Sequence, residues 1–317
     1  MTQPGVWVLA DPRAGTAAQA LGIAERLGLP FRVVDLQWGR LARWPIPWPS
    51  LAGLTAEARS RVTVPWPGLA LSAGRRSGPV ARWLRRHGAR TVHCMRPGLG
   101  AADFDLLVIG AHDRPQPAPN VMEILGACHR MSPGRLAAAR EEWAALEALP
   151  SPRVALLVGG PVRDEGMRPA AAAAIGRQVA GMAGSVMATT SRRTGAPASE
   201  ALSATLARRP HRLFRWGEGG ANPFAGFLAW ADAVVVTGDS VSMLSEALAT
   251  AAPVFVADPG GLGPRHLRLR ESLVAAGQAR ALGEGWFTRQ TLDESARVAA
   301  VIRARGWGVT AVGDATK

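Results

Sequence analysis

The stretch DAVVVTGDSVSMLSEALATAAPVFVAD, residues 232–258, carries the pattern that decides the fold. An apolar strand with its glycine-containing loop occupies 232–240, a helix is expected over 241–250, and a second apolar strand follows over 253–258. A strand, a helix and a strand in this order form a βαβ unit, in which the two strands run parallel. The stretch therefore predicts a parallel sheet in this half of the chain.

The same alternation of strands and helices extends in both directions from this stretch. In the same half, the pattern predicts strands at 153–161, 185–190 and 211–216, and helices at 168–182, 222–231, 266–277 and 288–304. In the other half, it predicts strands at 6–9, 31–36, 69–74, 91–94 and 105–113, and helices at 17–27, 80–87 and 132–150. We therefore expect an α/β protein with two doubly wound, Rossmann-like domains that face each other across a cleft.

The length and the proline pattern predict where the chain divides. A chain of 317 residues is longer than a domain with a single hydrophobic core usually is. The sequence Pro150-Ser151-Pro152 interrupts the helical pattern, and a new apolar strand begins directly after it. We expect an N-terminal domain over 1–150 and a C-terminal domain over 151–317.

The composition is typical of a globular protein, and its charge favours an anionic partner. The chain has 37 basic and 24 acidic residues, a formal charge of +13, which suits nucleotides, phosphosugars or an anionic lipid surface. The alternative is a general bias towards arginine. No nucleic-acid partner is expected, because the sequence has no RNP motif, no zinc-finger spacing and no block of basic residues. It also has no signal-peptide pattern and no apolar run of eighteen residues, so we expect a cytoplasmic protein, with peripheral attachment to the inner face of the membrane as the alternative.

Loops that follow strands of the second half are the first candidates for a binding site, because parallel sheets bind ligands beyond the carboxyl ends of their strands. In the loop after 232–237, Gly238 allows close approach of a ligand, and Asp239, Ser240 and Ser242 cap the next helix or bind a phosphate. Glu246, one turn into that helix, is a candidate for accepting hydrogen bonds from a ribose. Helix capping alone explains the serines equally well.

Two further loops in this half support the same interpretation. The loop Ser191-Arg192-Arg193-Thr194 follows a strand, and its two guanidinium groups suit a diphosphate, although a solvated charged loop is the alternative. Gly159 and Gly160 follow another strand and are expected at the same edge of the sheet.

Loops of the first half are candidates for the acceptor side of a site. The loop over 11–16 includes Arg13 and Gly15 but matches neither a dinucleotide-binding nor a Walker A motif. The loop over 74–79 includes Gly74, Arg75, Arg76 and Ser77.

His93 and Asp113 lie at the ends of predicted strands and are candidate general bases, against the alternative of a structural role. Neither shows metal-ligand spacing with a cysteine or a carboxylate. The segment 38–50, rich in Trp, Pro and Arg, is either a membrane-contacting surface or a packed irregular loop.

Several segments together resemble a known family. These are SAGRRSGPVARWLRR, FDLLVIGAHD, PNVMEILGACHRMSPGRL, VALLVGGP, TTSRRT, NPFAGFLAWADAVVVTGDSVSMLSEAL and PVFVAD. They are similar to a mitochondrial-fission-protein-like family of bacterial proteins assigned as glycosyltransferases, over about residues 7–300.

The resemblance implies the GT-B glycosyltransferase architecture, with a C-terminal helix that crosses back to the first domain. It implies transfer of a sugar from a nucleotide-diphosphate sugar, without a metal or other cofactor, to an acceptor that the sequence does not identify, with a lipid-linked or membrane-surface molecule as one candidate. Ser245 and Glu246 match a serine–glutamate pair that holds the ribose of the donor in such enzymes. The alternatives are a non-catalytic scaffold with the same fold and a nucleotide-sugar epimerase.

Overall fold

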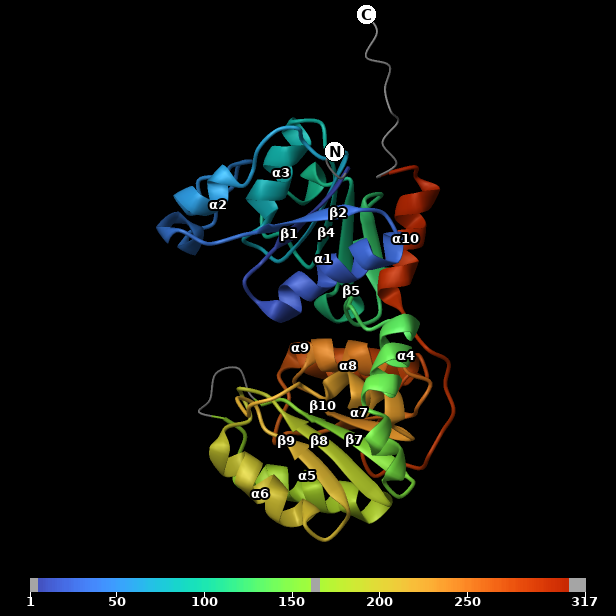
Figure 1. The fold of residues 1–317 in the computed structure, drawn as a ribbon. Coiled ribbons are helices and arrows are strands. Elements are labelled where there is room, and N and C mark those ends of the chain that lie inside the picture. The colour runs from blue at the N-terminus through green and yellow to red at the C-terminus, as the bar shows by residue number, and fades with distance from the viewer. Residues whose placement is uncertain (1–4, 161–165, 308–317) are drawn as a thin grey trace, which may run out of the picture. The chain divides into compact units, whose positions relative to one another are not determined.

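The computed structural model describes residues 5–160 and 166–307, which form two compact units (Figure 1). One unit comprises the described residues up to Arg130 and those from Asp293 onward, and the other comprises those between Met131 and Leu292. Among the described residues, each unit contains one six-stranded sheet, and every strand pair in both sheets is parallel. The predicted α/β class with two Rossmann-like domains is confirmed.

The first unit has the strand order β2-β1-β3-β4-β5-β6. Its strands are β1 (Val6–Ala10), β2 (Phe31–Asp35), β3 (Leu69–Ala73), β4 (Arg90–Cys94), β5 (Leu106–Gly110) and β6 (Val121–Ile124). Strands β1, β3 and β5 are buried along their whole length, which explains why their sequences are continuous apolar runs rather than alternating ones. The direction of winding reverses between β1 and β3, so the loops that follow these two strands lie beside each other.

Helices cover both faces of the first sheet. On one face lie α1 (Ala14–Leu27) and α10 (Glu294–Ala304), which are adjacent in Figure 1 and share one apolar cluster. On the other lie α2 (Ala56–Ser60) and α3 (Gly78–Arg86). The short 3-10 helices of this unit are η1 (Arg40–Arg43), η2 (Ala101–Asp103) and η3 (Ala111–Asp113).

The start of α10 is fastened to the first unit by hydrogen bonds as well as by packing. Glu294 accepts a hydrogen bond from the backbone N–H of Leu125 at 2.7 Å. The Ser295 hydroxyl accepts from the N–H of His129 and donates to its carbonyl, both at 2.8 Å. The described residues from 293 onward therefore belong structurally to the first unit, although they follow the second unit in the sequence.

The second unit has the strand order β12-β11-β10-β7-β8-β9. Its strands are β7 (Arg153–Val158), β8 (Ser185–Thr190), β9 (His211–Phe214), β10 (Ala233–Thr237), β11 (Val254–Ala257) and β12 (Arg280–Ala281). Read from β9, the order is 3-2-1-4-5-6, that of a dinucleotide-binding Rossmann sheet. The winding reverses between β7 and β10.

Helices also cover both faces of the second sheet (Figure 1). Helices α5 (Pro169–Met182) and α6 (Ala196–Leu206) pack on one face through a shared apolar cluster. Helices α7 (Phe224–Trp230), α8 (Val241–Ala247) and α9 (Pro264–Ala275) lie on the other. The pattern at 196–206 was not predicted as a helix, although Pro197 in its first turn and the apolar spacing are typical of one.

The boundary between the units lies at 130/131, whereas the sequence predicts it at 150/151. The intervening α4 (Pro133–Glu142) and η4 (Ala144–Ala148) pack on α7. The Arg140 guanidinium lies 3.8 Å from the ring centroid of Trp230, and the Trp230 ring donates a hydrogen bond to the Arg140 carbonyl at 3.1 Å. The proline break at 150–152 thus lies within the second unit, between η4 and β7.

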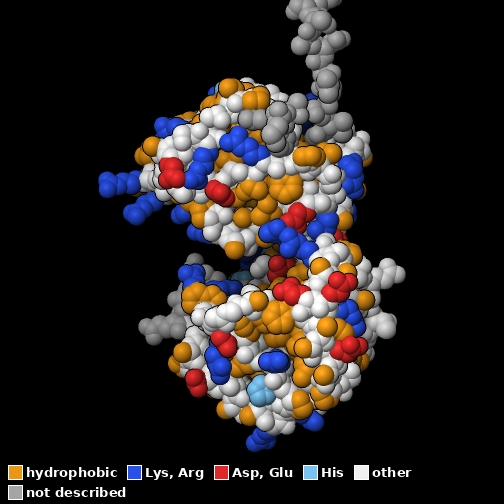
Figure 2. Space-filling model, in the orientation of Figure 1, with side chains coloured by type: hydrophobic (Ala, Val, Ile, Leu, Met, Phe, Trp, Pro, Cys, Tyr) orange, Lys and Arg blue, Asp and Glu red, His pale blue; other side chains and the backbone are white. Residues whose placement is uncertain are grey.

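The basic side chains are spread over the face shown in Figure 2 and do not form one block on it. This distribution agrees with the scattered arginines of the sequence. Cys94 and Cys128 are both buried free thiols. No helix in the described residues combines the length and apolar character needed to cross a bilayer.

Candidate functional site

Three loops meet beyond the carboxyl ends of β7, β8 and β10, and we call residues 159–160, 191–194 and 237–240 the loop cluster. The backbone N–H of Gly159 donates to the Thr237 hydroxyl at 2.7 Å. The N–H of Gly160 donates to the Asp239 carboxylate, also at 2.7 Å. The Thr194 hydroxyl donates to the Gly159 carbonyl at 2.6 Å. The predicted residues of these loops are therefore bonded to one another at the point where the winding of the sheet reverses.

The glycines of the loop cluster are required by this close approach. A Cβ atom on Gly160 would lie 2.1 Å from the backbone oxygen of Arg193, and one on Gly159 would lie 2.4 Å from the Asp239 carboxylate. A Cβ on Gly238 would lie 2.7 Å from the side chain of Leu262. These glycines let three loops pack directly on one another, which is a structural reason for them beside the predicted contact with a ligand.

The two arginines of the loop cluster have different surroundings. The Arg193 guanidinium lies 3.5 Å from the Asp239 carboxylate, so part of its charge is already balanced. Arg192 is exposed and has no ion pair among the described residues. Asp239 is 7% exposed, and its Oδ1 has no hydrogen-bond partner in the part of the chain that is described. Its contacts to Gly160 and Arg193 give it a role in joining the loops.

Some of the predicted residues of helix α8 are accessible at its surface, and others are buried. The Ser240 hydroxyl caps the helix by accepting from the Met243 N–H at 3.4 Å. The Ser245 side chain is buried and donates to the Val241 carbonyl at 2.8 Å, as a hydroxyl within a helix commonly does. Ser242 is exposed and Glu246 is partly exposed, so these two remain accessible on the helix surface.

Burial raises the pKa of Glu246 from 4.5 to about 7. The cause is loss of hydration, which disfavours the charged carboxylate. A carboxylate with such a pKa changes its charge near neutral pH, and partly buried groups of this kind concentrate at functional sites.

The raised pKa predicts how stability depends on pH. Because the folded state binds a proton at Glu246 more tightly than the unfolded state does, the free energy of unfolding should fall as pH rises from about 4.5 to about 7. Glu246→Gln removes this pH-dependent contribution, so the stability of the variant relative to the native protein should rise by about 3 kcal/mol between pH 4 and pH 8. Urea unfolding of both proteins across this range measures it. A constant difference between them would contradict the raised pKa.

A pocket of about 320 Å³ adjoins the loop cluster on the β8 side. Arg192, Arg215 and Trp216 contribute to its lining together with Ser199 and Glu200 of α6. Ser199 is 5% exposed, and its hydroxyl has no hydrogen-bond partner among the described residues. Trp216 is 61% exposed. A flat aromatic ring and an unpaired buried hydroxyl beside an exposed guanidinium suit an aromatic ligand that carries a negative group.

In the first unit, the two predicted acceptor-side loops also meet where the winding reverses. A Cβ on Gly74, whose φ is +82°, would lie 2.9 Å from the Thr16 methyl group, so the loops after β1 and β3 are in contact. Arg13 and Gly15 at the start of α1 are exposed. Ser77 is buried and donates to the carbonyls of Ala73 and Gly74. Arg75, which is exposed, and Arg76, which is half-buried, lie between Gly74 and Ser77 in this loop.

The two candidate bases lie in different surroundings. His93 is fully buried within β4, where its Nδ1 lies 2.8 Å from the Ser72 hydroxyl, and burial lowers its pKa to about 3. It is therefore a neutral ring inside the sheet. Asp113 lies at the end of η3, with a carboxylate oxygen 3.7 Å from Nε2 of His112. Asp113 is the more accessible of the two, because its side chain is 16% exposed.

A comparison with protein families finds a match over almost the whole chain. A family model described as mitochondrial fission ELM1 matches residues 14–306. The chain belongs to this family. The mitochondrial fission protein ELM1 of Arabidopsis thaliana is 26% identical over 299 residues, which cover 81% of this chain and 69% of the plant protein. An uncharacterised protein of Rickettsia prowazekii, RP120, is 27% identical over 116 residues, which cover 34% of this chain and 32% of that protein.

Solved structures with the same fold come from sugar-nucleotide enzymes and glycosyltransferases. A Listeria monocytogenes protein assigned as a UDP-N-acetylglucosamine 2-epimerase aligns with a TM-score of 0.53 at 15% identity, covering 96% of this chain and 88% of that one. The glycosyltransferase SnogD of Streptomyces nogalater aligns with a TM-score of 0.51 at 16% identity, covering 96% and 95%. This member of the ELM1 family thus has the GT-B fold, as the resemblance implied.

Arg289 is hydrogen-bonded to the end of α8, the helix that carries Glu246, and no sequence pattern marks Arg289 as part of the site. Its guanidinium donates to carbonyl oxygens at and beyond the end of α8, and burial lowers its pKa to about 10. The carbonyls belong to Ala247 at 3.0 Å, Leu248 at 3.1 Å, Thr250 at 2.7 Å and Ala252 at 2.8 Å. A cation at this end also complements the helix dipole. Only the tertiary structure shows this contact, because Arg289 lies some forty residues further along the chain.

Replacement of Arg289 by methionine should lower the free energy of unfolding by about 2 kcal/mol, since several half-buried carbonyls would lose their donor. Arg177→Met, at an exposed position of α5 with no side-chain hydrogen bond among the described residues, is the matched control and should change it by less than about 0.5 kcal/mol. Equal losses in the two variants, measured by urea unfolding, would show that the carbonyl contacts contribute nothing.

Proposed function

We propose that this protein binds a nucleotide-diphosphate sugar at the loop cluster of its second unit and transfers the sugar to an acceptor hydroxyl. The observation that carries the proposal is the junction of three loops at the reversal of the sheet, where Asp239 contacts both Gly160 and Arg193 and α8 begins. This is the position at which open parallel sheets bind nucleotides.

Each part of the donor has a matching group in the second unit. Arg192 and the amino end of α8 supply positive charge for the diphosphate. Glu246 accepts hydrogen bonds from the two ribose hydroxyls. The base occupies the pocket of Trp216 and Ser199, with its ring against the indole. No metal is required in this scheme, because the guanidinium and the helix end neutralise the leaving diphosphate.

The reaction consists of one bond formed and one broken. The oxygen of the acceptor hydroxyl attacks the anomeric carbon, the bond from that carbon to the diphosphate breaks, and the nucleoside diphosphate leaves with the electron pair. The hydroxyl proton passes to a base, for which Asp113 is the more accessible of the two predicted residues.

A second candidate function is epimerisation of the sugar on the same donor. The structural similarity to the Listeria protein assigned as a UDP-N-acetylglucosamine 2-epimerase favours it. An epimerase needs no acceptor, so the two activities are separable in a single experiment. A scaffold that binds the donor without chemistry is the third outcome.

The test is titration calorimetry of the native protein with a panel of UDP-, GDP- and dTDP-sugars, followed by NMR of each mixture over time. We expect one nucleotide class to bind and the matching nucleoside monophosphate to bind at least tenfold more weakly, because it lacks the second phosphate. Release of nucleoside diphosphate on addition of a cell-lipid extract supports the transferase. A new sugar epimer without acceptor supports the epimerase. No binding of any member of the panel overturns the proposal.

A further inference from the structure

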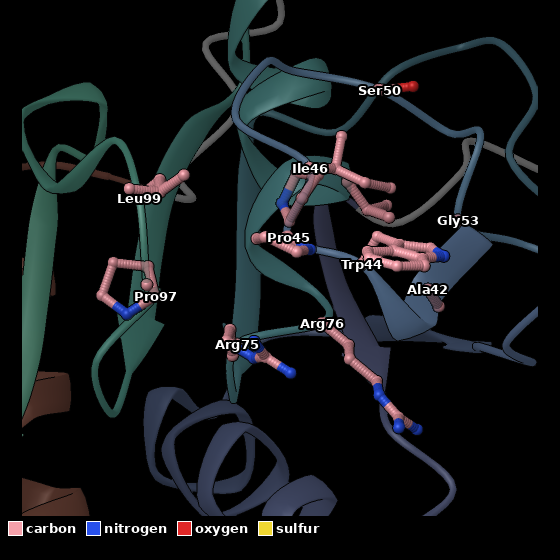
Figure 3. A pocket seen from close by; sticks show the side chains of 13 residues that line it. Ala42, Trp44, Pro45, Ile46, Ser50, Gly53, Arg75, Arg76, Pro97 and Leu99 are labelled. Carbon is pink, nitrogen blue, oxygen red and sulfur yellow. The ribbon is translucent and has the colours of Figure 1, made fainter.

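The first unit contains a cavity of about 250 Å³ with an apolar wall and two guanidinium groups at one end (Figure 3). The apolar wall is formed by Trp44, Pro45, Ile46, Val80, Pro97 and Leu99. In Figure 3, Trp44, Pro45 and Ile46 lie on one side and Pro97 and Leu99 on the other, while Arg75 and Arg76 extend from the same end of the cavity. The cavity is thus amphipathic along its length.

The segment 44–50, which contributes Trp44, Pro45 and Ile46 to the wall, is hydrogen-bonded to the rest of the first unit. The Arg82 side chain, which is 6% exposed and paired with Asp103, donates to the Pro47 carbonyl at 2.9 Å. The backbone N–H of Ser50 donates to the Pro79 carbonyl at 3.1 Å. These two hydrogen bonds fix the backbone of segment 44–50, which carries Trp44 and Trp48.

Large apolar side chains that line the cavity, or that belong to the segment forming one of its walls, are exposed. Trp44 is 73% exposed, Trp48 62%, Leu41 57% and Leu99 52%. Exposed apolar groups gathered at one place mark an interaction surface. Tryptophan beside arginine is the combination found where proteins meet the headgroup region of a membrane.

The charged side chains of the two segments that form the cavity wall, 36–55 and 74–100, are all basic. Arg40, Arg43 and Arg75 are exposed and Arg76 is half-buried, and none has an ion pair among the described residues. The segments 36–55 and 74–100, which contain the cavity wall, include no aspartate or glutamate. An anionic ligand therefore meets no opposing carboxylate from these segments.

We propose that this cavity binds an anionic phospholipid of the membrane surface, with its phosphate at Arg75 and Arg76 and the first part of one acyl chain along the apolar wall. Trp44 and Trp48 enter the interface beside it. The proposal goes beyond the donor site of the second unit and does not depend on it. Charge complementarity and the apolar wall together favour a lipid over a free phosphate, which would use only the arginines.

The first test is flotation of the full chain with vesicles of phosphatidylcholine alone or with phosphatidic acid. We expect binding only to the anionic vesicles. Arg75→Ala/Arg76→Ala should weaken it roughly 30-fold, at about fivefold for each arginine near the surface. The control, Arg177→Ala/Arg208→Ala, removes two exposed arginines of the second unit and should weaken it less than about threefold. Equal effects of the two double variants overturn the proposal in favour of general attraction by the net charge of +13.

The second test separates lipid from free phosphate by calorimetry of the full chain with dioctanoyl phosphatidic acid, below its micellar concentration, and with glycerol 3-phosphate. We expect the lipid to bind and Trp44→Ala to weaken it by about tenfold, while circular dichroism shows an unchanged fold because that indole is largely exposed. Equal binding of glycerol 3-phosphate, or no effect of Trp44→Ala, overturns the proposal.

Discussion

Replacing Gly160 with alanine should lower the free energy of unfolding of the second unit by about 3 kcal/mol and abolish nucleotide binding. The new Cβ would lie 2.1 Å from the carbonyl oxygen of Arg193, which is backbone and cannot rotate away. Relief of the clash requires the loops after β7 and β8 to separate, which stretches the hydrogen bonds from the Gly160 N–H to Asp239 and from Thr194 to Gly159. Overpacking of this kind costs about 1 to 3 kcal/mol before lost hydrogen bonds are added.

Gly181→Ala is the matched control, because a Cβ at that exposed position of α5 meets nothing within 4 Å. It should leave stability unchanged or raise it by up to about 1 kcal/mol, since alanine favours a helix over glycine. Urea unfolding and calorimetry with the nucleotide sugar measure both effects. If Gly160→Ala behaves like Gly181→Ala, the loops do not approach as closely as described and the loop cluster loses its basis.

Glu246→Ala should weaken nucleotide-sugar binding by about 100-fold. The carboxylate is proposed to accept two hydrogen bonds from the ribose, and charge-assisted hydrogen bonds contribute about 1.5 to 3 kcal/mol each before desolvation is subtracted. Glu271→Ala, at an exposed position of α9, removes the same charge elsewhere in the second unit and should change the affinity by less than twofold.

The pKa of Glu246, about 7, adds a second measurement to this prediction. Only the ionised carboxylate accepts both hydrogen bonds, so binding should be roughly tenfold tighter at pH 8 than at pH 6. A nucleotide sugar is the appropriate ligand, because its substituted diphosphate does not itself titrate in this range. Glu246→Gln should show a flat profile. An unchanged affinity in Glu246→Ala would contradict the ribose assignment even if the protein binds nucleotides.

The sequence was sufficient for the local elements and for the class of fold. Buried parallel strands such as β7 and β10 are continuous apolar runs, and helices such as α5 begin at a proline, so their positions follow from local chemistry. The expectation that loops 159–160, 191–194 and 237–240 lie at one edge needed only the rule that parallel strands end together. The short strand β12 has too little pattern to be recognised.

Contacts between distant segments account for what the sequence did not reveal. Arg193 and Arg192 are neighbours in the sequence with the same chemistry, but only Arg193 lies beside Asp239. His93 is predicted at a strand end, yet its side chain is completely buried, beside the Ser72 hydroxyl and the Phe104 ring. Nothing near Ser199 or Arg289 in the sequence distinguishes these two residues, the first buried and the second half-buried, from the exposed serines and arginines of the chain.

Local patterns in the sequence are enough to predict two parallel sheets covered by helices, because the apolar run of a strand buried on both faces and the turn residues at its ends are local properties. Contacts in the folded protein set which loops touch, which arginine of the 191–194 loop lies beside Asp239, and that α4 packs on the second unit while α10 packs on the first. Ion pairing, burial and the resulting pKa shifts depend on groups that the strand order brings together. No single segment of the sequence determines that order, because it depends on contacts between segments that are distant in the chain.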